Sequence, residues 1–161
     1  MKYFWYCLFL IIGLLMNREA DAQLILPCED PLKYNQYFSC GEPFMPVCGC
    51  NQKTYRNGCV SLNVFGVNEI FSDGVCKDEN FYFEINPNAS YEKTTFNIQF
   101  YTTGSYSIQI FDLYGKVMYF NNQSNVHWIQ DDIYFSGFRP GFYLFTVTSG
   151  NTFRTKKLIV K

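Results

Sequence analysis

Histidine is almost missing from this 161-residue chain, since His127 is the single one. A nucleophile would therefore have one candidate imidazole base, and a metal site built from several histidines is excluded. An excess of positive charge is also missing, because 13 lysines and arginines face 14 aspartates and glutamates. A basic surface for nucleic acid is not expected. With no constellation of nucleophile and base, and no cluster of metal ligands, the sequence predicts neither an enzyme nor a cofactor.

Cysteine is missing from the C-terminal half of the chain, because none of the seven cysteines follows Cys76. Residues 77–161 are rich in Phe, Tyr, Thr and Asn instead, and they begin with the polar run 77–80. This change in composition predicts two small domains, 23–76 and 81–161, joined by a linker at 77–80.

The N-terminal apolar segment is too short for a membrane span, which needs about 20 apolar residues. A basic start, an apolar stretch over residues 3–16 and the closing run Ala20-Asp21-Ala22 are typical of a secretory signal peptide, which we place at residues 1–22. Its removal takes Cys7 away and leaves six cysteines in an oxidising compartment. We therefore predict export to the periplasm and beyond, without a permanent membrane span.

Disulfides are expected to stabilise the first domain, because about 50 residues rarely form a sufficient hydrophobic core. Six cysteines allow 15 connectivities, and spacing alone does not choose among them. A zinc site at Cys48, Cys50 and Cys59 is disfavoured, since the paired C-x-x-C knuckles of such sites are missing.

The run from Pro46 to Cys59 reads PVCGCNQKTYRNGC, with seven residues between Cys40 and Cys48 and ten between Cys48 and Cys59. Together with the Gly-Val-Cys ending at Cys76, this pattern resembles the Kazal-type protease-inhibitor domain over residues 28–76. The resemblance implies a small disulfide-rich α+β domain. It also implies three disulfides, which are Cys40–Cys59, Cys48–Cys76 and, with these two assigned, Cys28–Cys50.

The pattern departs from that family at one cysteine. The usual fifth cysteine is absent near Leu62 and Asn63, and Cys50 stands instead in a Cys-Gly-Cys arrangement similar to that of some bacterial Kazal-like modules.

The same resemblance implies a reactive-site loop between Cys40 and Cys48. Glu42 would enter the primary specificity pocket of a protease, and the scissile bond would be Glu42–Pro43. Asn57 would support the loop through hydrogen bonds to its backbone, and Tyr55 would lie in the core. Asn57 also suits the N-cap of a helix at 59–65, and Gly66 suits its end.

Two hypotheses about function follow from Pro43. A proline after the scissile bond has no N–H, and most serine proteases process such a bond poorly. It also biases Glu42 toward the extended backbone of an inserted loop. The first hypothesis is a secreted inhibitor of an extracellular serine protease. The second is a non-inhibitory, disulfide-stapled binding or scaffold module at the cell surface.

Residues 81–161 alternate between apolar and polar side chains with a period of two, which is typical of half-buried strands. The predicted strands are 81–85, 95–100, 106–110, 116–120, 126–129, 143–147 and 152–160. Short strands at this spacing predict an all-β immunoglobulin-like sandwich.

Four motifs in this region are Ile85-Asn86-Pro87-Asn88, Asp112-Leu-Tyr-Gly-Lys116, Pro140-Gly-Phe-Tyr143 and the basic end Lys156–Lys161. Their order resembles the C-terminal sorting domain of the type IX secretion system of Bacteroidetes-type bacteria, although Ala89 replaces a usual proline. The resemblance implies a type IX translocon and a sortase as partners. The protein would then be released or anchored on the outer cell surface.

Overall fold

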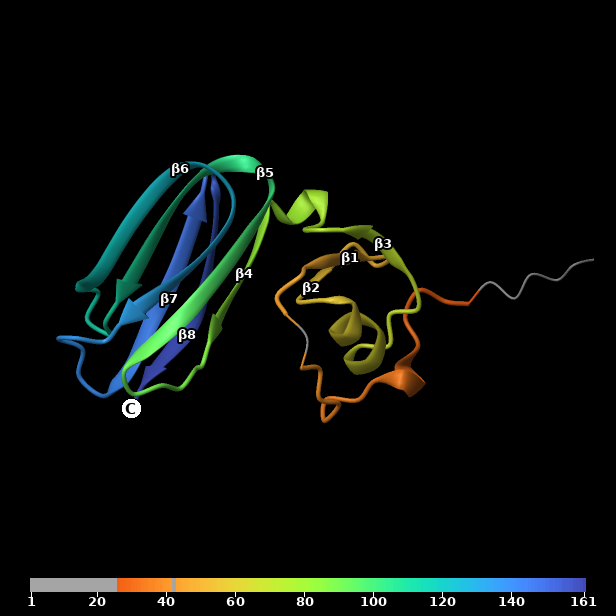
Figure 1. Cartoon of the computed structure of the whole chain (residues 1–161), viewed down its shortest axis with the longest axis horizontal. Coiled ribbons are helices and arrows are strands. Elements are labelled where there is room, and N and C mark those ends of the chain that lie inside the picture. Colours follow the sequence, from red (N-terminus) through yellow and green to blue (C-terminus); the bar gives the residue numbers. More distant parts are fainter. Residues whose placement is uncertain (1–25, 42) are drawn as a thin grey trace, which may run out of the picture.

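A computed structural model describes residues 26–41 and 43–161, and it contains two β-structured regions that lie side by side (Figure 1). The predicted signal peptide at 1–22 lies outside the described residues, and so does Glu42. None of the helices in the described part is long and apolar enough to cross a membrane.

The first region is a small antiparallel sheet with short helices around it. The sheet has the strand order β2-β1-β3, with β1 at Val47–Gly49, β2 at Thr54–Tyr55 and β3 at Ile70–Asp73. The 3-10 helix η1 spans Pro31–Lys33, and the π-helix η2 spans Val60–Val64. The buried cluster of this region consists of Val47, Tyr55 and Val67.

The helix expected at 59–65 is present, but its main part is the π-helix η2 rather than an α-helix. Gly66 ends it with a φ of +66°, and a Cβ atom at this position would lie 2.4 Å from the carbonyl oxygen of Asp30. Only glycine fits both the backbone conformation and this close approach.

Three disulfides connect the segments of the first region, and they join Cys28 to Cys50, Cys40 to Cys59 and Cys48 to Cys76. These are the three pairs that the resemblance implies. They tie the N-terminal segment, the predicted loop and the end of the region to the small sheet.

The second region contains five strands where the sequence predicts seven. They are β4 at Phe81–Asn86, β5 at Lys93–Phe111, β6 at Val117–Tyr134, β7 at Gly141–Ser149 and β8 at Thr152–Val160. The predicted strands 95–100 and 106–110 are both parts of β5, and 116–120 and 126–129 are both parts of β6. The predicted break between residues 100 and 106 is therefore wrong: the β5–β6 register shifts on both sides of Gly104, but the chain does not reverse.

The two long strands β5 and β6 bend across two layers (Figure 1). The first part of β5 pairs with β4, and its last part pairs with β7, which in turn pairs with β8. Phe83 of β4 stacks on Phe145 of β7 at 5.7 Å between ring centroids, so the two layers enclose one core. We call residues 81–160 the sandwich.

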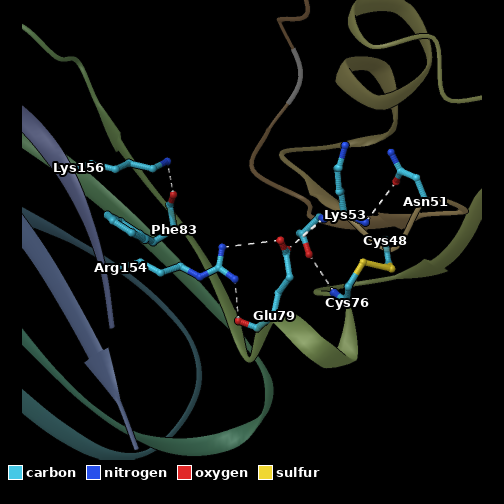
Figure 2. A network of polar contacts seen from close by, with 9 residues as sticks. Cys48, Asn51, Lys53, Cys76, Glu79, Phe83, Arg154 and Lys156 are labelled. Atoms are coloured by element: carbon cyan, nitrogen blue, oxygen red, sulfur yellow. Dashed lines mark hydrogen bonds and ion pairs between the residues drawn. A yellow bond between two sulfur atoms is a disulfide. The ribbon is translucent and has the colours of Figure 1, made fainter. Parts of the chain in front are cut away.

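The segment predicted as a linker contains the 3-10 helix η3 at Lys77–Glu79 and connects the two regions through hydrogen bonds. The amide of Thr54 donates to Glu79 Oε2 at 3.0 Å, and Arg154 of β8 donates to the carbonyl oxygen of Glu79 at 3.2 Å. Figure 2 shows Arg154 reaching Glu79, and beside it Lys156 reaching the carbonyl oxygen of Phe83. Glu79 therefore contacts both β2 and β8.

Candidate functional site

The predicted loop is held at both ends by disulfides. Cys40 is bonded to Cys59 at the start of the helical segment, and Cys48 in β1 is bonded to Cys76. Between them Pro43 is exposed, and the amide of Met45 donates to the carbonyl oxygen of Arg56 at 3.0 Å. The loop thus combines an exposed Pro43 with a backbone fixed on its C-terminal side.

Asn57 connects the loop to the helical segment. Its side chain is 3% exposed, and its Nδ2 donates to the carbonyl oxygen of Pro43 at 3.1 Å. Its Oδ1 accepts from the amide of Val60 at 2.9 Å, which is the hydrogen bond of a helix N-cap. One buried side chain therefore fixes the backbone directly after the predicted scissile bond.

Tyr55, two residues before Asn57, lies in the buried cluster of the first region. Its ring packs against Phe65 with the centroids 5.2 Å apart, and its hydroxyl accepts from Asn51 Nδ2 at 2.7 Å. The structure thus brings Pro43, Asn57 and Tyr55 into one small region, while Glu42 lies outside the described residues.

Two contacts join the first region to the sandwich, and the sequence predicted neither of them. Phe44 stacks on Tyr82 of β4, with the ring centroids 5.9 Å apart and the planes inclined by 20°. The Arg56 guanidinium pairs with the Glu84 carboxylate at 2.9 Å. In β4, Tyr82 and Glu84 alternate with the buried Phe81, Phe83 and Ile85, and so they point away from the sandwich core. No sequence signal named what they contact.

In the described part of the chain, no group of three or more His, Cys, Asp or Glu side chains is placed to hold a metal ion. His127 is an exposed residue of β6.

The motifs of the sandwich stabilise its turns. Asp112 Oδ1 accepts from the amides of Tyr114 and Lys116, both at 2.9 Å, which closes the turn between β5 and β6. The Tyr143 hydroxyl accepts from the amide of Arg139 and donates to its carbonyl oxygen, at 3.0 and 2.8 Å. These side chains therefore bond to the backbone of their own turns.

Residues 85–161 match the family described as the secretion system C-terminal sorting domain. This region is a type IX sorting domain. The sorting domain starts within β4 and includes the whole of β5, β6, β7 and β8. The chain is therefore a protein exported through the type IX secretion system, to the outer surface or the extracellular space.

No curated protein matches the chain. Among solved structures, it is similar to the crystal structure of dimeric latent PorU from Porphyromonas gingivalis, with 16% sequence identity and a TM-score of 0.45. The similarity covers 78% of this chain and 17% of that chain, so this chain spans only a small part of that protein's length. A likeness of this size says nothing about the activity of the first region.

Proposed function

We propose that residues 28–76 form a Kazal-like inhibitor of an extracellular serine protease, and that the sorting domain delivers it outside the cell. The main support is the position of Asn57, which holds the carbonyl oxygen of Pro43 at 3.1 Å while disulfides fix both ends of the loop. A loop that is ordered before binding loses little conformational entropy in a protease cleft. Such a loop binds like a substrate and is released slowly as product.

The side chain of Glu42 would set specificity in this function. A carboxylate suits a pocket lined by basic or polar groups, as in glutamyl-specific proteases, and it is disfavoured in an apolar pocket. Pro43 would restrict the set of target enzymes further, because it has no backbone N–H to donate.

A non-inhibitory binding or scaffold module at the cell surface is the competing function. Its support is a set of exposed apolar side chains in the N-terminal segment, where Leu32 is 96% and Tyr37 is 87% exposed. Such side chains could bind a partner without any role for the loop.

Loop variants of the full mature chain separate the two functions. Replacing Pro43→Glu restores a backbone N–H, and replacing Glu42 by Leu, Lys or Arg supplies a side chain that common serine-protease pockets accept. We expect each double variant to inhibit the matching enzyme, chymotrypsin-like for Leu and trypsin-like for Lys or Arg, in steady-state kinetics. Digestion of the double variants at this loop would contradict the inhibitor function and favour the scaffold.

Adding Asn57→Ala to the inhibitory double variant is expected to weaken binding by about 1–3 kcal/mol, because the Pro43 carbonyl loses its buried donor. The matched control is Asn63→Ala, which removes an exposed amide six residues further along the chain, where Nδ2 lies 3.7 Å from Cys59 Sγ. Thermal unfolding of each variant shows whether the lost helix cap at Val60 has unfolded the region. Equal inhibition constants for Asn57→Ala and Asn63→Ala would show that Asn57 does not support the loop.

A further inference from the structure

The outward face of β4 packs against the loop of the first region. Phe44 lies two residues after Glu42 and stacks on Tyr82. The side chain of Arg56 pairs with Glu84, and the carbonyl oxygen of Arg56 accepts from the Met45 amide of the loop. Outward residues of an edge strand would normally face water. Here the side chains of Arg56 and Glu84 are only 29% and 22% exposed, so this part of β4 is a covered surface.

The surroundings of Tyr82 support this description. Burial, and after it the nearby Glu84 carboxylate, raises the pKa of the Tyr82 hydroxyl to about 12. Beside this contact lies a cleft of about 780 Å³, lined on one side by residues 43–47 and on the other by Gln99 and Trp128 of the sandwich. The C-terminal half of the loop and the sandwich therefore line one cleft.

A protease that takes the loop as a substrate contacts residues on both sides of the scissile bond. Phe44 would have to leave the ring of Tyr82 before its side chain could enter such a cleft. The sandwich would also occupy space that the enzyme needs next to residues 43–47. Binding then requires an open arrangement of the two regions, and the apparent affinity falls with the fraction of molecules that are open.

We propose that the sandwich is an intramolecular cover over the inhibitory loop, so that the full-length chain is a partly latent inhibitor whose activity rises when the sandwich moves away or is removed. This inference depends on the proposed inhibitory function, but the contact it describes can be tested separately. The connecting segment is Lys77–Asn80, so opening has to break the hydrogen bond of Glu79 with Thr54 or the one with Arg154. Figure 2 shows the contact with Arg154. Relative motion of two domains in one chain is the default expectation unless their interface is large and hydrophobic.

The test uses the full mature chain with the loop variant Glu42→Leu/Pro43→Glu and a chymotrypsin-like enzyme. Adding Glu84→Arg places a second guanidinium opposite Arg56 and should open the contact, which lowers the inhibition constant about tenfold. Adding Arg56→Glu to Glu84→Arg restores an ion pair of reversed polarity and should return the constant to its starting value. Tyr82→Ala removes the ring on which Phe44 stacks and should also open the contact. It replaces Glu84→Arg in the test if that variant does not fold.

The matched control is Asp132→Arg, which breaks the ion pair between Lys93 and Asp132 at the end of the sandwich where β4 and β5 are joined by a loop. It should leave the inhibition constant unchanged. Exchange of the Phe44 and Met45 amides, measured by mass spectrometry, reports on the cover without any protease. It should become faster in Glu84→Arg and Tyr82→Ala only.

The outcomes separate the two proposals. Equal inhibition constants in all variants, with unchanged amide exchange, would overturn the cover and leave the inhibitor intact. Absence of inhibition in every variant would contradict the inhibitory function. In that case faster exchange in the opening variants would still support the covering contact, and unchanged exchange would overturn it as well.

Discussion

Reduction of the three disulfides is expected to unfold residues 28–76 while the sandwich stays folded. Among the described residues, the apolar cluster of the first region has three buried members, Val47, Tyr55 and Val67, whereas the sandwich buries sixteen residues in one core. The disulfides connect cysteines 22, 19 and 28 positions apart, and closing a loop of this length stabilises a fold by about 3 kcal/mol. The three disulfides together therefore contribute about as much as the whole free energy of unfolding of a small domain.

Hydrogen exchange with and without reductant measures this directly. Amides of β1, β2 and β3 should lose protection on reduction, while those of β5 and β7 should keep it. The double replacement Cys48→Ser/Cys76→Ser is the sharper variant, because it removes the bond that ties β1 to the end of the region. Protection of β1 in the reduced protein would show that the core is sufficient alone, and loss of protection in β7 would show that the sandwich depends on the disulfides.

Deletion of Ser149–Lys161 is expected to trap the protein in the periplasm of a host that has the type IX machinery. The deleted strand β8 pairs with β7 along its whole length, from Gly141↔Val160 to Ser149↔Thr152. Its Leu158 is fully buried and Val160 is 5% exposed, so deletion uncovers the core and leaves β7 with an open edge. The basic end of the sorting domain is removed in the same step.

Fractionation of cells into periplasm, outer surface and medium gives the measurement. The matched control Lys157→Gln/Lys161→Gln keeps strand β8 but removes two exposed charges, and so it separates the fold of the sandwich from the charge at its end. We expect the truncation to be retained completely. Secretion of the truncated protein at the level of the intact chain would contradict a sorting role for this region.

The sequence predicted most of the β structure, since alternation at Phe96, Ile98 and Phe100 and again at Tyr143, Phe145 and Val147 reflects burial on one face of a strand. It did not predict that β5 continues through Thr103-Gly104. The same residues that permit a turn also permit a bend, and the choice depends on which strands pair on either side.

The candidate site was predictable only within the first region. The place of Asn57 before residues 59–65 suggested a helix cap, the Kazal resemblance implied its contact with the loop, and both hydrogen bonds are present. The stacking of Phe44 on Tyr82 and the pairing of Arg56 with Glu84 depend on how two regions face one another. Local patterns carry no information about such a contact, because each partner is an ordinary outward residue of its own segment.

Titration of the mature chain against a panel of proteases is the most direct measurement of inhibition. The panel contains trypsin-like, chymotrypsin-like, subtilisin-like and glutamyl-specific enzymes, and the Glu84→Arg form is assayed beside the wild type. We expect stoichiometric inhibition of a glutamyl-specific enzyme, with the Glu42–Pro43 bond intact in the isolated complex. Absence of inhibition by both forms across the panel, or rapid cleavage in the loop between Cys40 and Cys48, would contradict an inhibitory role.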